Sequence, residues 1–302
     1  MDMLKNDSLC TIRGETLRKR LEESPIVITP GAYDSWSARL IEQAGFPAIY
    51  LTGYGVTAAS LGMPDLGLIT GSELADQVRR ISDVTRVPLI ADADTGFGGV
   101  LNVRRTVHDY IRAGAAAIQL EDQVSPKRCG HMDDKQVTDV TEMVEKIHMA
   151  VDARGDVPLQ IIARTDARAT HDLDEALRRG ERYLRAGADI LFVEAPRTEE
   201  EMARICGTFR GEKLLANMVE GGKTPYLSPA TLQQIGYAIA IYPATLLFSA
   251  TYAIGRTLSQ LCDGRIDTAA LASFSQFNER MGLQDYFAAT DRIQSNAREH
   301  AL

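Results

Sequence analysis

The chain has 302 residues and a formal net charge of −8, with 45% hydrophobic, 25% charged and 6% aromatic residues. This composition is ordinary for a soluble globular enzyme, and an acidic chain without a basic cluster argues against nucleic acid or a membrane surface as partner. The sequence contains no signal-like apolar segment and no apolar run of membrane-spanning length, so we expect a cytoplasmic location.

Short apolar runs alternate along the chain with stretches of helical spacing. They predict eight buried strands, each followed by a helix, over residues 26–29, 48–51, 88–92, 117–121, 159–164, 190–194, 213–217 and 238–242. The turns at Gly114 and Gly187 each end a predicted helix and lead into the next strand, which is typical of repeated βα units. No dinucleotide-binding glycine fingerprint follows the first strand, so we predict a (β/α)8 TIM-type barrel rather than an open doubly wound sheet.

The flanks of the barrel are predicted to be helical. Leu17 and Leu21 belong to a short amphipathic helix before the barrel, and the first strand is expected to stop at Pro30-Gly31. Asp34 or Ser35 is the candidate N-cap of the next helix, which runs to Ala44 with Gly45 as its left-handed C-terminal residue. We predict a single barrel domain over residues 1–302. Its C-terminal helical extension, from about residue 267 to 302, should carry Leu271, Phe274 and Phe277 in helical register.

Most of the predicted strands end in polar or ionisable residues. These residues are Thr52 and Gly53, Asp92 and Asp94, Glu121, Arg164 and Asp166, Glu194, and Asn217. In a barrel of this type the strand ends meet at one face, where reactive groups gather. One carboxylate at a strand end often only caps a helix, but successive ionisable strand ends are harder to explain in that way. Acids held so close together repel one another unless a cation lies between them.

A hard divalent cation is therefore predicted, with Asp92, Asp94 and Glu121 as its candidate ligands. Oxygen ligands and retained waters suit Mg²⁺, with Mn²⁺ as a possible substitute. Asp92 and Asp94 alternate on a strand and nominally face opposite ways. We expect the glycine-rich turn over residues 95–99 to break strand geometry early enough for both to reach the ion. The alternative, a phosphate cradle, lacks the lysine and Ser/Thr of a P-loop.

Two features at the strand ends suit an anionic substrate. Arg164 offers a planar fork for a substrate carboxylate, and a salt bridge to Glu121 or Glu194 would be compatible with this role. Thr52 and the amide of Gly53 could bind a second carboxylate.

The loop after the fourth strand contains Cys129 directly after the cationic Lys127 and Arg128, with His131 two residues on. Such surroundings lower a thiol pKa, although an incidental thiol in a surface loop is the alternative. A zinc site at Cys129 and His131 is disfavoured, because no second ligand pair exists. The four cysteines are scattered, which also disfavours a disulfide framework.

Taken together, these residues resemble the isocitrate lyase / phosphoenolpyruvate mutase superfamily, and within it the short lyases acting on 2-methylisocitrate or 2,3-dimethylmalate. The resemblance runs from about Arg13 to about Asp285. It rests on YLTG (50–53), GMPDLG (62–67), DADTGFG (92–98), EDQ (121–123), KRCGH (127–131), ARTD (163–166) and ANMVE (216–220). The KRCGH string is specific for the lyases, since the phosphonopyruvate-forming mutases and the oxaloacetate decarboxylases lack it.

The resemblance implies a barrel whose last helix is exchanged with a neighbouring subunit, in a homotetramer built as a dimer of dimers. It implies that Asp92 and Asp94 hold Mg²⁺ largely through water, with Glu121 nearby, and that the loop bearing Cys129 closes over the substrate. The implied substrate contacts are Thr52, Gly53, Tyr54, Asp65, Lys127, Gly130, His131, Arg164, Glu194 and Asn217.

The implied reaction is cleavage of a metal-chelated 2-hydroxy acid. Loss of the hydroxyl proton drives C2–C3 cleavage to pyruvate and a carbanion conjugated to a carboxylate, which takes a proton from Cys129. Glu121 and Arg164 complete the catalytic group, with Tyr50 as a partner for the hydroxyl or its proton.

One departure from the family concerns substrate choice. Two arginines that methylisocitrate lyases use for their tricarboxylate align with Phe248 and Phe277. An anionic substituent left unpaired there would cost several kcal/mol, so a substituted malate such as 2,3-dimethylmalate is favoured unless Arg256 or Arg280 supplies the charge. The alternatives are a 2-methylisocitrate lyase, an oxaloacetate hydrolase or carboxyphosphonoenolpyruvate mutase-type relative, and a non-catalytic sensor of a metal–carboxylate complex.

Overall fold

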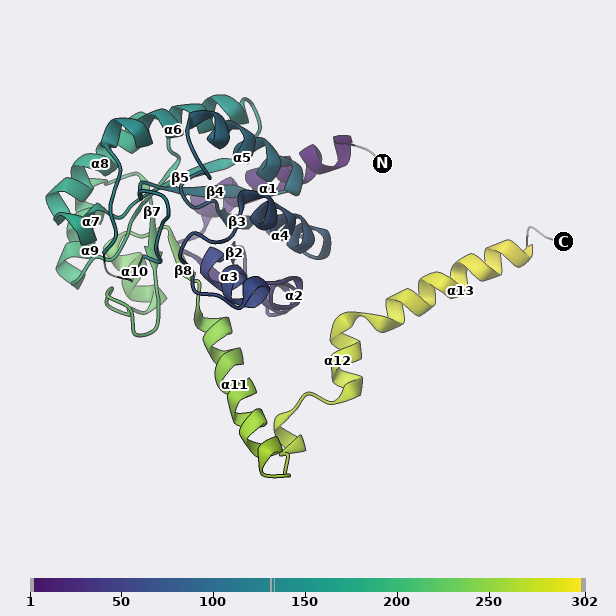
Figure 1. The fold of residues 1–302 in the computed structure, drawn as a ribbon. Coiled ribbons are helices and arrows are strands. Elements are labelled where there is room, and N and C mark those ends of the chain that lie inside the picture. The colour runs from purple at the N-terminus through teal and green to yellow at the C-terminus, as the bar shows by residue number, and fades with distance from the viewer. Residues whose placement is uncertain (1–2, 131, 133, 300–302) are drawn as a thin grey trace. The chain divides into compact units, whose positions relative to one another are not determined.

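The computed structural model describes residues 3–130, 132 and 134–299. The chain divides into two compact units, residues 1–248 and 249–302. In the first unit, parallel strands close into a barrel in the order β1 to β8, surrounded by helices (Figure 1). The strands are β1 (Val27–Ala32), β2 (Ile49–Leu51), β3 (Leu89–Asp92), β4 (Ala117–Glu121), β5 (Gln160–Thr165), β6 (Ile190–Val193), β7 (Lys213–Asn217) and β8 (Ile239–Tyr242). The predicted (β/α)8 barrel is therefore confirmed.

The helices of the first unit begin with one that precedes the barrel and continue between successive strands. They are α1 (Met3–Glu23), α2 (Ser35–Gln43), α3 (Gly53–Leu61), α4 (Gly71–Val84), α5 (Val100–Ala113), α6 (Val140–Arg154), α7 (Ala167–Thr170), α8 (Leu173–Arg185), α9 (Glu199–Thr208) and α10 (Pro229–Ile235). The prediction for α2 is confirmed, because Asp34 accepts the Ser37 N–H at 2.6 Å and Gly45 has a φ of +83°. Helix α11 (Thr245–Cys262) continues from the first unit into the second.

Strand β1 differs from its prediction at one end. It continues through Pro30 and Gly31 to Ala32, with Pro30 paired to Tyr242 and Gly31 to Tyr50. A Cβ at Gly31 would lie 2.3 Å from the carbonyl oxygen of Pro243, so glycine is what lets the strand pass close to its neighbour. The expected stop at Pro30-Gly31 is therefore wrong, because this glycine serves close packing rather than a turn.

Successive side chains along each strand point alternately into the barrel and towards the surrounding helices. The hydrophobic core therefore has one part inside the strands and another outside them. Residues such as Tyr50, Ile90 and Phe192 fill the barrel interior. The opposite faces of the strands pack against the surrounding helices in two further clusters, one around Leu89 and Ile118 and the other on β6 to β8. The interior is thus filled with side chains below the strand ends, which leaves room for a site only at a mouth of the barrel.

Arg13 joins α1 to two barrel helices. Its guanidinium is buried and donates to the carbonyl oxygens of Gly114 at 3.0 Å and Ser82 at 2.9 Å, and also to that of Thr85. These carbonyls lie at the C-terminal ends of α4 and α5, where no further helical N–H is available to them.

The second unit contains the end of α11, a short 3-10 helix (Thr268–Ala270), α12 (Phe274–Met281) and α13 (Leu283–Glu299). Phe274 and Phe277 are helical as predicted, but Leu271 lies in the link after the 3-10 helix. Large apolar side chains of this unit are exposed, among them Tyr252, Phe274 and Tyr286 at 76%, 86% and 68%. Within the described residues, no helix has both the length and the apolarity needed to cross a bilayer.

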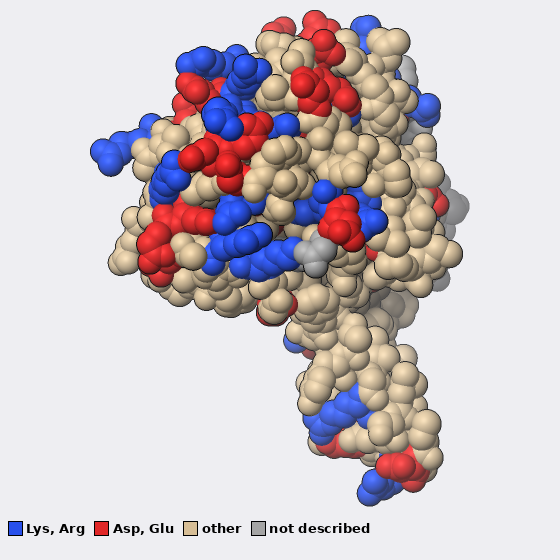
Figure 2. Space-filling model, turned by 60° about the vertical axis from the view of Figure 1, so that its left-hand side comes forward, with Lys and Arg blue, Asp and Glu red and all other residues tan. Residues whose placement is uncertain are grey.

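The surface charge is mixed on the face that Figure 2 shows. There the described lysine and arginine side chains interleave with aspartate and glutamate. Many of the chain's exposed charges pair within one helix, as Arg79 does with Asp76 at 2.7 Å and Arg178 with Glu175 at 2.8 Å.

Candidate active site

A cavity of about 220 Å³ opens in the first unit where the strands end. The predicted site residues that line it are Tyr50, Thr52, Tyr54, Asp65, Asp92, Glu121, Lys127, Cys129, Gly130, Arg164 and Asn217. Gly53, Asp94 and Glu194 are not in its lining but lie against residues that are. His131 lies outside the described residues. The volume suits a small carboxylic acid rather than a nucleotide.

Asp92 and Asp94 come together because the backbone leaves strand geometry between them. Strand β3 ends at Asp92, and Asp94 has a left-handed φ of +46°. The Asp94 N–H donates to Asp92 Oδ1 at 3.1 Å. A Cβ built on Gly53 would lie 2.8 Å from Asp92 Oδ2 and 3.6 Å from Asp94 Oδ1, so both carboxylates face the start of α3. Glycine at residue 53 leaves the space that these carboxylates occupy.

Lys127 places a positive charge among the acids. Its Nζ lies 2.7 Å from Asp65 Oδ1 and 2.8 Å from Asp94 Oδ1, and its side chain is 5% exposed. Burial alone would lower the pKa of Lys127, but Asp94 and Asp65 raise it well above the usual range. Burial raises the pKa of Asp94 to about 7 although Lys127 opposes the change. The lysine is therefore charged, and it only partly compensates the carboxylates.

Arg164 occupies the centre of a second group of carboxylates. It donates to Asp166 through Nε at 2.9 Å and Nη2 at 3.1 Å, and lies 3.3 Å from both Glu121 Oε2 and Glu194 Oε2. Its guanidinium carbon is 5.1 Å from the centre of the Phe192 ring. The salt bridge to Glu121 or Glu194 that the sequence left open as an alternative is thus present with both residues. These contacts also fix the plane of the fork, which is the geometry needed for binding a carboxylate.

The site as a whole is short of positive charge. Among the described residues, six buried acids lie close to three buried cations: the acids are Asp65, Asp92, Asp94, Glu121, Asp166 and Glu194, and the cations are Lys127, Lys135 and Arg164. Burial raises the pKa of Glu121 well above its usual range, which Arg164 offsets only in part, and Glu121 Oε1 has no hydrogen-bond partner among the described residues. No three described His, Cys, Asp or Glu side chains lie close enough to chelate an ion directly. The donor set fits a hard divalent cation held largely through water.

Tyr50 faces the cavity as a neutral phenol. Burial, with a smaller contribution from Asp92, raises its pKa well above the usual range. Its hydroxyl donates to Gln119 Oε1 at 3.2 Å. The oxygen lone pairs of Tyr50 are thereby left to accept a hydrogen bond from a molecule in the cavity.

Cys129 lies on a loop whose two ends are held together. Val124 N–H donates to the Gln136 carbonyl at 2.8 Å, and Gln123 pairs with Val137 in an antiparallel bridge. The thiol lines the cavity and is half-buried, whereas Cys10 and Cys206 are buried and Cys262 is exposed. None of these four cysteines forms a disulfide.

The opposite wall of the cavity is largely apolar. It includes Val219, Pro243, Ala244 and Phe248, whose ring stands edge-on to Tyr54 at 6.3 Å between centroids. Of the two phenylalanines singled out in the sequence, Phe248 therefore lines the cavity. Phe277 belongs to the second unit.

Several polar residues at the site were given no role from the sequence, although Asp122 and Glu220 belong to the EDQ and ANMVE motifs. Lys135 and Asp122 support Asp166, and Glu220 lines the cavity, where Thr245 donates to it at 2.5 Å. Gln119 could have been predicted from the sequence, because it lies two residues before Glu121 on β4 and so points to the same side of the strand. Lys135 could not, because the path of a long loop decides where its side chain ends.

The closed barrel with an ionisable cavity at the carboxyl ends of its strands defines the protein as a (β/α)8-barrel enzyme. Comparison with known proteins narrows the class. The family model described as phosphoenolpyruvate phosphomutase matches residues 17–262, and the chain belongs to this family.

Two characterised relatives show which activities occur among similar sequences. The chain is 49% identical over 273 residues to 2,3-dimethylmalate lyase of Eubacterium barkeri, covering 89% of this chain and 93% of the relative. It is 43% identical over 289 residues to 2-methylisocitrate lyase of Aeropyrum pernix, covering 95% and 92%.

Two solved structures are similar over nearly the whole chain. A crystal structure of 2,3-dimethylmalate lyase superposes with a TM-score of 0.89 at 36% identity, covering 93% of this chain and 95% of that one. Phosphonopyruvate hydrolase in complex with oxalate and Mg²⁺ superposes with a TM-score of 0.83 at 31% identity, covering 93% and 98%. The resemblance inferred from the motifs is confirmed.

Proposed function

We propose that the chain is a Mg²⁺-dependent carbon–carbon lyase that cleaves a 2-hydroxy acid, a C2/C3-substituted malate, into pyruvate and a second carboxylic acid. The observation that carries the proposal is that one cavity holds the carboxylates of β3 and β4, the Arg164 fork and the thiol of Cys129. A site that only bound a metal–carboxylate complex would have little use for a thiol on its covering loop.

Substrate carboxylates have two suitable binding places in the cavity. The guanidinium of Arg164 has its plane already fixed by Asp166. Its contacts to Glu121 and Glu194 are long, at 3.3 Å, so the guanidinium can still form short hydrogen bonds to a substrate carboxylate. Thr52 caps α3, so the positive end of this helix is at the cavity wall. Asn217 donates to Glu194 at 3.1 Å and lines the cavity from β7.

Mg²⁺ would be held by Asp92, Asp94 and Glu121, largely through water, and Mn²⁺ would be a substitute. When bound, the ion acts as a Lewis acid that polarises the hydroxyl and carboxylate oxygens of the substrate. The shortage of positive charge in the cavity and the partnerless Glu121 Oε1 support this assignment. It is also in line with the Mg²⁺ and oxalate of the similar phosphonopyruvate hydrolase.

Proton transfers can be assigned to two side chains. Tyr50 donates a hydrogen bond to Gln119, so its oxygen is positioned to accept a hydrogen bond from the substrate hydroxyl and to orient it. The proton that this hydroxyl loses passes to the carboxylate of Glu121, which lines the cavity and whose Oε1 has no hydrogen-bond partner among the described residues. On the loop side, Cys129 supplies a proton to the carboxylate-conjugated carbanion left by C2–C3 cleavage. A positioned general acid is typically worth about 10²–10⁴ in rate.

The apolar wall supports a substituted malate as the substrate. Phe248 stands where a methyl or other alkyl substituent would be buried, and a third carboxylate there would lose its hydration without gaining a partner. The second candidate is 2-methylisocitrate, favoured by the relative of that activity at 43% identity and by Arg128, which also lines the cavity.

Helix exchange and a homotetramer are part of the proposal. Taken by itself, the second unit leaves large apolar side chains of α11 and α12 exposed, among them Tyr252 and Phe274. Such surfaces are typical of segments covered by another subunit. We assign the protein to the cytoplasm, where its four cysteines, none of which forms a disulfide, would stay reduced.

The test is pyruvate release from a panel of 2-hydroxy diacids and triacids, with Mg²⁺ and after chelation. We expect 2,3-dimethylmalate or a close analogue to give the highest kcat/KM, and chelation to abolish turnover. The Cys129→Ala variant should fold, bind pyruvate and lose at least about 10²-fold in kcat. Cys262→Ser, at an exposed thiol in the second unit, is the matched control. Tight binding of pyruvate or oxalate without turnover of any acid would favour the sensor instead.

A further inference from the structure

Lys135 is a buried cation that the proposed reaction does not use. Its side chain is 1% exposed, and it lies near the end of the loop that carries Cys129. Its Nζ donates to the carbonyl oxygen of Gly130 at 2.5 Å and contacts Asp166 Oδ1 at 2.5 Å. One ammonium group thus joins the peptide next to the thiol to a carboxylate at the end of β5.

The contact to Gly130 completes a set of supports on either side of Cys129. On the preceding side, the Gln123 side chain donates to the Arg128 carbonyl at 2.8 Å and accepts the Arg128 N–H at 3.0 Å. On the following side, the bond from Lys135 is the matching support. The loop residue that would deliver a proton is therefore held at the peptide groups before and after it.

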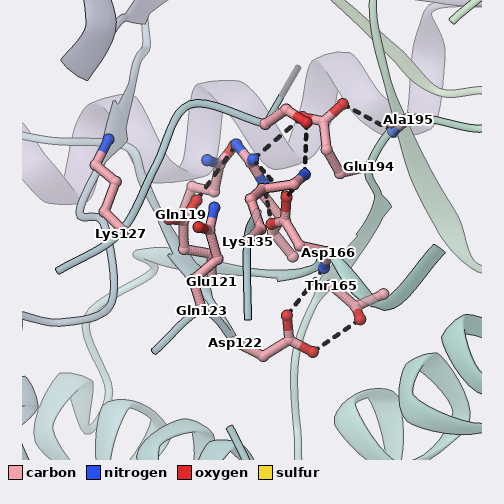
Figure 3. Close-up of polar contacts among 12 residues, drawn as sticks. Gln119, Glu121, Asp122, Gln123, Lys127, Lys135, Thr165, Asp166, Glu194 and Ala195 are labelled. Carbon is pink, nitrogen blue, oxygen red and sulfur yellow. Dashed lines mark hydrogen bonds and ion pairs between the residues drawn. The ribbon is translucent and has the colours of Figure 1, made fainter. Parts of the chain in front are cut away.

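The contact to Asp166 connects the same lysine to the substrate-binding fork. Asp166 is fully buried and orients Arg164 through two hydrogen bonds, at 2.9 and 3.1 Å. Its own backbone is fixed by Asp122, which accepts the Asp166 N–H at 2.9 Å. Figure 3 shows Lys135 and Asp166 next to each other, with Asp122 on the far side. Although burial opposes it, Arg164 and Lys135 lower the pKa of Asp166 to about 2, so this carboxylate stays charged between two cations.

We infer that Lys135 is a positioning residue that couples the Cys129 loop to the Arg164 fork. Through Gly130 it fixes the loop, and through Asp166 it fixes the fork, so that the acid and the carboxylate-binding group keep one relative position. The reaction served by this coupling rests on the proposed function, whereas the tie between the loop and Asp166 does not. A lysine that merely filled a buried space would affect stability without affecting the exposure of the thiol.

The experiment measures how fast Cys129 is alkylated by iodoacetamide in the full-length protein. A Cys262→Ser background removes the exposed thiol, and peptide mass mapping reports Cys10 and Cys206, which react only if the fold opens. Lys135→Met removes the charge at similar length. The matched control is Lys213→Met, because Lys213 also donates to a backbone carbonyl, that of Leu21 at 2.8 Å, at the opposite end of the strands.

We expect Lys135→Met to accelerate the alkylation of Cys129 roughly tenfold or more, the scale of one hydrogen bond from a charged group, while Cys10 and Cys206 stay unreactive. Where the parent releases pyruvate, kcat should fall about 10²-fold with little change in KM. The Lys213→Met control should change neither the alkylation rate of Cys129 nor kcat. Lys135→Gln, which keeps an N–H donor but loses the charge, gives the same comparison if the methionine variant does not fold.

Equal alkylation rates in the Lys135 and Lys213 variants would overturn the inference, whether or not any acid is cleaved. Faster alkylation together with an inactive parent protein would instead uphold the tie and refute the proposed reaction.

Discussion

Gly130 offers a sharp test of the site, because its surroundings leave no room for a side chain. A Cβ there would lie 2.4 Å from Arg164 Nη2 and 2.6 Å from Glu194 Oε2, where ordinary contacts begin at 3.4 Å. The Gly130→Ala variant must therefore move the loop or the ion pair by roughly 1 Å. A displacement of that size at a reacting group costs on the order of 10²-fold in rate, or about 3 kcal/mol of transition-state stabilisation.

The assay is steady-state pyruvate release, with thermal unfolding measured alongside. We expect kcat of the Gly130→Ala variant to fall about 10²-fold while its Tm stays close to that of the parent, since the clash arises on a loop outside the barrel core. Gly207→Ala is the control, because nothing lies within 4 Å of a Cβ at that helical position. If the Gly130 variant kept kcat within about threefold of the parent, the loop would not close on Arg164 and Glu194 as described, and the reasoning would be refuted.

Three further changes address specificity and stability. Phe248→Arg should raise kcat/KM for 2-methylisocitrate relative to 2,3-dimethylmalate by about tenfold or more, since it gives a third carboxylate a partner; an unchanged ratio would contradict the role of this wall. Asp166→Asn removes a carboxylate whose pKa is about 2 in the folded protein against 3.8 ordinarily, so its contribution of about 2 kcal/mol is present above pH 4 and is lost as pH falls through about 2. The difference in urea unfolding free energy between parent and variant should therefore shrink from pH 6 to pH 2. Arg13→Met leaves helix-end carbonyls without their donor and should cost roughly 2–4 kcal/mol of stability, with KM unchanged when assayed well below the unfolding temperature.

The fold could be predicted from the sequence because each βα unit repeats one local pattern. An apolar run, an ionisable end and a helix closed by glycine recur, and the observed β4 and β7 have the predicted bounds of residues 117–121 and 213–217. The error at Pro30-Gly31 has a local cause. A glycine that permits close approach of a neighbour looks the same in sequence as one that makes a turn.

The site could be predicted only in part, because the sequence indicates where a strand ends but not which groups its side chains contact. Strand order brings Asp92, Glu121 and Arg164 to one mouth, and the convergence of Asp94 with Asp92 depends on a single left-handed residue. Lys127 was expected to contact substrate, yet in the structure it pairs with two carboxylates. The position of Lys135 depends on how a loop of more than a dozen residues folds back on itself, which no local pattern encodes.

The rim of the barrel is divided between two sets of strands. Most of the charged groups come from β3 to β6, with Asp65 before β3 and Glu220 after β7, whereas the apolar residues Val219, Pro243 and Phe248 follow β7 and β8. Mutations of the apolar residues that follow β7 and β8 can alter which alkyl or acidic substituent of the substrate is accepted without disturbing the catalytic residues. The substrate specificity of such a chain can therefore change during evolution while its reaction stays the same. This agrees with relatives in sequence that are named for different hydroxy acids.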